Sequence, residues 1–195
     1  MEIVFALVAF SFVSSVTPGP NNVLLWASGA AFGVRRTIPH IVGTAAGIGA
    51  MALAAAAGLG ALVTTVPGLA VAMKVVGSVY LLYLAFRIAS ARGLTKGELA
   101  SPLGVIQAAA FQVINPKAWI FALGAITTFR PSGLSAVEGA ILVATTMMAV
   151  ILPTAALWAA GGGAINGLLT NERRRRAVSL LLAALVAATV ASVWI

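Results

Sequence analysis

The residues best suited to chemistry in this chain are Asn115, Pro116 and Lys117, near the middle of the apolar stretch 103–129. An unbroken membrane helix there would place the lysine ammonium deep in hydrocarbon, at a cost of at least about 2.5–3.5 kcal/mol. Proline favours the first position of a helix and asparagine favours the capping position before it, so we expect a half-helix to begin here. Its free N–H groups, together with Lys117, would bind an anion such as a carboxylate.

A second break is predicted in the first apolar stretch, at Thr17, Pro18, Gly19, Pro20, Asn21 and Asn22. The two prolines and the glycine remove backbone donors and interrupt a helix, and Asn21 is a suitable cap for the helical piece that follows. Unwound carbonyl groups in such a break can bind a cation, here a substrate ammonium. Two breaks that face one another would therefore recognise a zwitterion.

Each of these features also has a structural interpretation. Residues 115–117 are compatible with a proline kink whose lysine extends to the membrane surface, and residues 17–22 with a loop that ends a short span. Lys74 and His40, the only histidine, are further candidates for the transport pathway. Lys74 is equally compatible with a side chain that reaches the outer interface, and His40 with a structural role at the start of its span.

Composition shows which solvent surrounds these motifs. Hydrophobic residues make up 61% of the 195 residues, charged residues only 8%, and the mean hydropathy is +1.07. A soluble domain carries roughly 25% charged residues, so this surface must face lipid. The apolar stretches are about 20 residues or longer, the length of a membrane-spanning helix, and they lack the alternation of a barrel strand. We therefore expect an all-α polytopic membrane protein of about six transmembrane helices.

The predicted spans fall into two related halves within one transmembrane domain, residues 1–195. The halves are residues 1–88 and 103–195, with three spans each, and the broken helices are spans one and four. Pro20 and Pro116 lie 96 residues apart (116 − 20), close to half of the chain. An odd number of spans per half makes the halves enter the membrane in opposite senses. This pattern predicts a 3+3 inverted repeat with the binding site between the broken helices.

Basic residues predict the orientation. The net charge is +8, and the basic residues of the predicted first, third and fifth loops are Arg35, Arg36, Arg92, Lys96 and Arg173 to Arg176. The second and fourth loops carry only Arg130. The positive-inside rule then places the odd loops in the cytoplasm and both termini outside. Because the charge follows the loops, we interpret it as an anchor to the lipid bilayer and expect no nucleic-acid partner.

The acidic residues and the missing residue types limit the mechanism. All four acids, which are glutamates, lie at a terminus or in or beside a loop, so no carboxylate relay or sodium site is expected at mid-membrane. A proton-coupled transporter would then have to titrate Lys117, Lys74, His40 or the substrate itself. With one histidine and no cysteine, the chain lacks the groups that an intramembrane enzyme or a metal site needs. We expect no enzyme activity and no cofactor, while a scaffold subunit, an importer and a channel stay open as alternatives.

Several of these motifs together resemble the LysE/RhtB family of amino-acid exporters, in its homoserine, threonine and cysteine efflux branch. The resemblance covers nearly the whole chain. It is carried by the Thr-Pro-Gly-Pro-Asn motif at 17–21, Gly-Val-Arg at 33–35, the glycines at 43 and 47, Tyr-Leu-Leu-Tyr-Leu at 80–84 and Asn-Pro-Lys at 115–117. Ala85 departs from the glycine that often follows the tyrosine segment in the family.

The resemblance implies a six-span exporter of the bacterial inner membrane, driven by the proton-motive force, for zwitterionic amino acids or their derivatives. The transport residues that it implies are Pro18, Gly19, Pro20, Asn21, Asn115, Pro116 and Lys117. The motifs specify neither the amino acid nor whether the protein forms a homo-oligomer.

Overall fold

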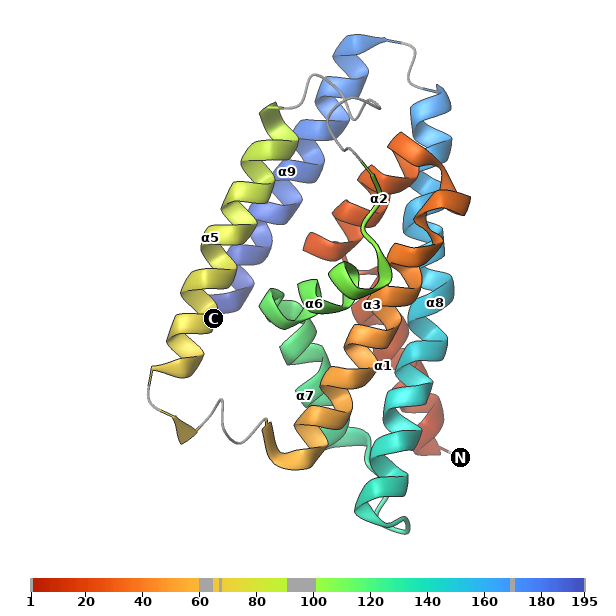
Figure 1. Ribbon diagram of the computed structural model, residues 1–195, viewed down its shortest axis with the longest axis vertical. Helices are drawn as coiled ribbons and strands as arrows, with labels where there is room; N and C mark the ends of the chain where they lie inside the picture. The colour runs from red at the N-terminus through yellow and green to blue at the C-terminus, as the bar shows by residue number, and fades with distance from the viewer. Residues whose placement is uncertain (1, 60–64, 67, 91–100, 169–170, 195) are drawn as a thin grey trace.

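The computed structural model describes residues 2–59, 65–66, 68–90, 101–168 and 171–194, and within these ranges every regular element is a helix (Figure 1). The elements are α1 (Glu2–Val16), α2 (Pro20–Phe32), α3 (Val34–Ala54), the π-helical turn η1 (Ala55–Leu59), α5 (Leu69–Ser90), α6 (Val105–Ile114), α7 (Pro116–Phe129), α8 (Ala136–Leu168) and α9 (Glu172–Trp194).

Both predicted breaks are confirmed. The axes of α1 and α2 differ by 63°, and those of α6 and α7 by 82°. Pro20 and Pro116 each stand in the first turn of the helix that follows, where the missing N–H costs nothing. The cap of α2 is Gly19, and Asn21 lies inside the helix, so the predicted capping role of Asn21 is wrong. Its side-chain oxygen instead accepts hydrogen bonds from Gln112 and Thr44.

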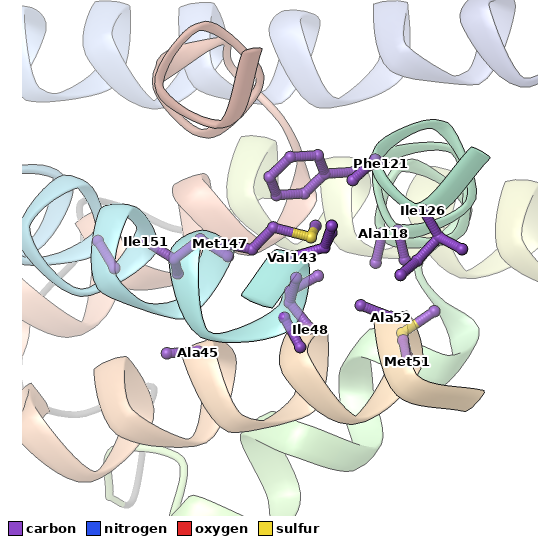
Figure 2. Close-up of a cluster of buried hydrophobic side chains, with 14 of the residues drawn as sticks. Ala45, Ile48, Met51, Ala52, Ala118, Phe121, Ile126, Val143, Met147 and Ile151 are labelled. Atoms are coloured by element: carbon purple, nitrogen blue, oxygen red, sulfur yellow. The ribbon is translucent and has the colours of Figure 1, made fainter. Parts of the chain in front are cut away.

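The main hydrophobic core lies among α3, α7 and α8, as Figure 2 shows. Ile48 of α3, Phe121 of α7 and Met147 of α8 point into it, and all three are buried. Leu7 of α1 is buried in the same core, and Phe10 of α1 packs against it, where it contacts the rings of Phe121 and Phe129. The core therefore fixes α7, and with it the second break, against two long helices.

Glycines bring several helices into backbone contact. A Cβ atom on Gly29 of α2 would lie 1.9 Å from the carbonyl oxygen of Ala159 in α8, and one on Gly162 would lie 2.0 Å from that of Trp26. Gly43 and Gly47 of α3 approach α6 in the same way. Small residues at this spacing permit such close packing of membrane helices. The glycines at 43 and 47 thus allow α3 to pack closely against α6 within one chain.

The helices α5 and α9 form a separate antiparallel pair beside the rest of the molecule (Figure 1). Leu81 and Ala85 of α5 pack with Leu182 and Val186 of α9, and Val23 of α2 joins this second cluster. On α5, Gly77 faces the ring of Pro116, where a Cβ atom would lie 2.6 Å from Cγ. The pair therefore adjoins both broken segments without entering the main core.

By length and hydropathy, the described helices provide fewer membrane spans than the six expected. Two of the described helices are long and apolar enough to cross a membrane, or four when each bent pair counts as one span. The helix α9 begins at Glu172, so the arginines at 173–176 lie within it rather than in a preceding loop, and Asn171 Oδ1 accepts the N–H of Arg173 at its start. The predicted linker residues Arg92 and Lys96 lie outside the described residues.

Candidate functional site

The two breaks lie against one another. Lys117, in the first turn of α7, donates from Nζ to the carbonyl oxygen of Thr17 at 2.5 Å and to that of Pro18 at 3.5 Å. Asn22 Nδ2 donates to the carbonyl oxygens of Ser15 and Thr17, both at 2.8 Å. The carbonyl groups freed by the first break are thus bound by side chains, as the backbone of a membrane protein requires.

Gly19 makes this contact possible. It is buried beneath the lysine stem, and a Cβ atom at this position would lie 2.9 Å from Lys117 Cδ and 3.2 Å from Nζ. Its φ of −167° is ordinary extended backbone, so the glycine is required for space and not for conformation.

A chain of buried polar side chains connects the two halves of the site. Asn21 Oδ1 accepts a hydrogen bond from Gln112 Nε2 at 3.0 Å and lies 3.2 Å from Thr44 Oγ1. The second Nε2 hydrogen of Gln112 goes to the carbonyl oxygen of Ala108, which fixes the amide orientation. Asn115 Nδ2 then donates to Gln112 Oε1 at 3.3 Å. These hydrogen bonds connect the first break, α3 and the second break, and so fix their positions relative to one another.

Asn115 retains an unused acceptor. It occupies the capping position of α7, as predicted, but its side chain makes no capping bond. Its Oδ1 is buried and has no hydrogen-bond partner among the described residues. Leaving a buried polar atom unpaired costs about 1–3 kcal/mol, so this oxygen is a strong candidate to accept a bond from a bound molecule.

Two cavities adjoin the breaks, and Pro20, Asn115 and Lys117 line both. The small cavity has a volume of about 50 Å³ and is lined by the hydrogen-bonded polar side chains described above and by core residues such as Phe121. The large cavity offers about 490 Å³ and opens toward the α5–α9 pair. The rest of its lining is Thr17, Pro18, Leu81, Ile120, Leu185, Ala188 and Thr189. Lys117 and Asn115 are therefore accessible from both cavities.

The charge of Lys117 has no carboxylate near it among the described residues. Three of the four glutamates are described, and they stand in the first turns of α1, α8 and α9, away from either break. A lysine without a counter-ion in an apolar environment attracts an anion. The described residues also contain no cluster of three potential metal ligands, and the site offers instead an ammonium, an amide and backbone carbonyls.

The sequence-predicted residues divide into two groups. Of those in the two breaks, all but Pro116 line one or both cavities, namely Thr17, Pro18, Gly19, Pro20, Asn21, Asn115 and Lys117, whereas the ring of Pro116 faces Gly77 of α5. Lys74 and His40 line neither cavity. The ammonium of Lys74 lies 5.7 Å from the ring centre of Trp194, within cation–π range. His40 is buried, and neither ring nitrogen has a partner among the described residues.

Sequence reasoning missed Gln112, Thr44 and Asn22. Gln112 carried a signal, because it is polar within an apolar stretch and precedes Asn115 by three residues, which places both on one helix face. Asn22 was part of the recognised motif, but its bonds to Ser15 and Thr17 depend on how the chain turns there. Thr44 carried no signal, since threonine in a membrane helix usually bonds its own backbone, as it also does here to His40.

Similar proteins point in the same direction. A cysteine/O-acetylserine efflux protein of Klebsiella pneumoniae is 28% identical over 127 residues, 65% of either chain. Proteins of the same name are 28% identical over 120 residues in Salmonella typhimurium, 62% of either chain, and 27% identical over 139 residues in Escherichia coli K12. The last match covers 69% of this chain and 71% of the relative. No solved structure matches this chain.

The chain spans about two thirds or slightly less of the length of the first of these relatives. The family match is longer, because the model of the LysE type translocator covers residues 12–193 and so includes both breaks, both cavities and the α5–α9 pair. That family consists of membrane translocators and not of enzymes. On this match, the protein belongs to the family of LysE type translocators.

Proposed function

We propose that this protein exports a small zwitterionic amino acid or amino-acid derivative across the bacterial inner membrane, driven by the proton-motive force. Support comes from family membership and from relatives named for the efflux of cysteine and O-acetylserine. The observation that carries the proposal is the meeting of the two breaks beside a cavity. There the ammonium of Lys117, which has no carboxylate near it among the described residues, contacts the carbonyl oxygens of Thr17 and Pro18, and Asn115 Oδ1 on the same cavities has no partner; oxygens of this kind suit the substrate's own ammonium.

In this proposal the substrate carboxylate binds the ammonium of Lys117 at the positive end of the α7 dipole, since Pro116 has no N–H and the N–H of Ala118 is bound to the carbonyl oxygen of Asn115. The substrate ammonium binds the carbonyls of Thr17 and Pro18 and Asn115 Oδ1. Polar groups from both halves thus contact one small molecule. The two cavities on either side of Lys117 and Asn115 are the spaces through which it enters and leaves.

The arrangement of helices supports a 3+3 inverted repeat. Helices α1, α2, α3 and α5 of the first half correspond, in that order, to α6, α7, α8 and α9 of the second half. If each helix is replaced by its counterpart, most pairs of helices that are in contact become other pairs that are also in contact. The pair α1·α8 maps onto α3·α6, α2·α8 onto α3·α7, α2·α9 onto α5·α7, and α5·α9 onto itself. We propose that α5 and α9, with 22 and 23 residues, complete six spans.

We also propose that the odd loops face the cytoplasm and that both termini lie outside. The first turns of α3 and α9, which carry Arg35, Arg36 and the arginines at 173–176, lie at one end of the molecule (Figure 1). The end of α7, followed by Arg130, lies at the other end. Reporter fusions after residues 35, 66, 95, 131 and 172 test this orientation. Signals that alternate in any other order contradict it.

Export from preloaded cells tests the function. Cells that express the wild type are loaded with labelled cysteine or O-acetylserine, and efflux is compared with that of Lys117→Ala and Asn115→Ala. Both variants are expected to insert normally and to lose most of the export, by about tenfold or more, the loss produced by about 1.4 kcal/mol of binding. Thr128→Ala, at an exposed position on the same helix as Lys117, is the control and retains export. Unchanged efflux in both site variants removes the proposed site.

The driving force has its own test. The wild type is reconstituted in vesicles, and efflux of the same labelled amino acids is followed with and without an imposed pH gradient and membrane potential. Efflux that accelerates with the gradient and returns to the passive rate with an uncoupler agrees with proton coupling. Efflux that is indifferent to both contradicts it.

A further inference from the structure

The carbonyl groups proposed to bind a substrate ammonium are already occupied by an ammonium of the chain. Lys117 Nζ contacts the carbonyl oxygens of both Thr17 and Pro18, residues that precede it by about 100 positions. A lysine ammonium and an α-ammonium are both compact cations with three donors and no acceptor, so they suit the same oxygens. The Thr17 oxygen already accepts from both Lys117 and Asn22, which fills its two lone pairs, and two ammonium groups at the same oxygens would repel one another.

The surroundings of Lys117 allow its ammonium to leave these carbonyls. The side chain is a flexible four-carbon stem, and it lines the large cavity as well as the small one. No carboxylate among the residues that the structure describes holds it, and the bonds described for it are to neutral oxygens. An arriving carboxylate therefore offers a stronger partner than the one it has, because its full negative charge attracts the ammonium more strongly than the dipole of a neutral carbonyl group does.

We propose that Lys117 is a tethered competitor that keeps the ammonium site closed until a carboxylate draws it away. This rests on the proposed function and specifies its substrate class. The substrate's carboxylate pairs with Lys117, the lysine releases the first break, and the substrate's ammonium takes its place beside Asn115 Oδ1. A molecule needs both charges to complete this exchange. An amine without a carboxylate meets an occupied site, and a carboxylate without an amine leaves the Pro18 carbonyl without the lysine and the Thr17 carbonyl with Asn22 alone.

The exchange differs from a simpler role in which Lys117 only binds the carboxylate. In the simpler role the ammonium site is always open, so removal of the lysine leaves the affinity for an amine unchanged. In the competitor role the same removal opens the site, and an amine binds more tightly than before. The two roles therefore predict different changes for a ligand that has no carboxylate at all.

Binding measurements on the purified full chain separate the two roles. The probes are cysteine, cysteamine, which lacks the carboxylate, and 3-mercaptopropionate, which lacks the amine. The wild type is expected to bind cysteine and to bind both single-charge probes at least about tenfold more weakly, a difference of about 1.4 kcal/mol. Lys117→Met and Lys117→Gln are each expected to bind cysteamine at least about tenfold more tightly than the wild type does. Two neutral variants are used so that a folding failure in one leaves the other.

Arg130→Met is the matched control, because it removes a positive charge at the opposite end of α7 and leaves the breaks intact. It is expected to bind cysteamine as weakly as the wild type. Equal cysteamine affinity in the wild type and in the neutral Lys117 variants overturns the proposal. Failure of the exporter proposal has a separate readout, since it appears as absent efflux of cysteine and O-acetylserine by the wild type.

Discussion

The two breaks are alike in sequence and differ in the groups that they offer. In the first, residues 17–19 separate the helices and leave backbone carbonyls that side chains must bind. In the second, Asn115 alone separates the helices, and its backbone is paired on both sides, to Gln112 at 3.1 Å and to Ala118 at 3.0 Å. The first break therefore supplies backbone acceptors, while the second supplies side chains, the Lys117 ammonium and Asn115 Oδ1.

This difference shows that a proline fixes where a helix restarts but not what the break offers. Both prolines begin a helix, yet the residues before them decide how many carbonyls are freed. The two breaks also differ in their support. The helix after the first break packs backbone to backbone on α8, whereas the helix after the second packs through side chains in the main core. Three pairs of substitutions test these contrasts.

The largest effect is expected from a glycine pair, one on each restarted helix. In Gly29→Ala the new Cβ would lie 1.9 Å from the carbonyl oxygen of Ala159, so α2 and α8 must separate. We expect a loss of about 3 kcal/mol or more in the free energy of unfolding, the upper part of the range for overpacking. In Gly124→Ala the Cβ would lie 3.4 Å from Phe10 Cζ, an ordinary contact, and we expect no loss.

Both glycine variants can be compared as tagged proteins by gel filtration in detergent and by thermal unfolding. Alanine also favours a helix over glycine by about 1 kcal/mol, so Gly124→Ala controls for that gain. Equal yields and equal unfolding temperatures for the two variants would show that the backbone contact between α2 and α8 does not support the first break.

An intermediate effect is expected from the two asparagines. Asn21→Ala removes the acceptor that Gln112 and Thr44 share, although each keeps a backbone partner, and we expect a loss of about 1–2 kcal/mol in stability. Asn115→Ala removes one 3.3 Å bond and an oxygen that had no partner, so its cost to stability is expected to be smaller. Export is expected to follow the opposite order.

Unfolding and efflux of the two asparagine variants are best measured on the same preparations. A stability loss at Asn115 that exceeds the one at Asn21, with equal export in both, would contradict the division into a structural first asparagine and a substrate-binding second one.

Much of the fold followed from the sequence because its causes are local or compositional. Hydrophobic length predicts helices in lipid, and proline at Pro20 and Pro116 predicts where they restart. The capping role of Asn21 was not predictable in the same way, because the competing partner, Gln112, lies 91 residues away. Likewise, the motif around Pro18 indicated a cation site, but only the tertiary arrangement reveals that Lys117 occupies it. The start of α9 was misplaced because a run of arginines resembles a loop.

The smallest effect is expected from two tryptophans that each bond a carbonyl just before a break. Trp158 Nε1 donates to Ser15 at 3.3 Å, and Asn22 also donates to that oxygen. Trp119 Nε1 donates to Val113 at 2.8 Å, where the proline at 116 and the break remove the usual helical donors. Trp119→Phe thus leaves a carbonyl without its side-chain donor, whereas Trp158→Phe leaves one that is still bound.

We therefore expect Trp119→Phe to lower the free energy of unfolding by about 1 kcal/mol and Trp158→Phe to lower it by less. The Ser15 carbonyl keeps its bond from Asn22 when Trp158 is replaced, so no buried acceptor is left without a partner. Thermal unfolding of both variants and of the double variant measures the two effects. Because the tryptophans serve different breaks, their effects should add. A larger loss at Trp158 would mean that Asn22 does not hold the Ser15 carbonyl, and that the first break depends on α8 for this bond as it does for packing.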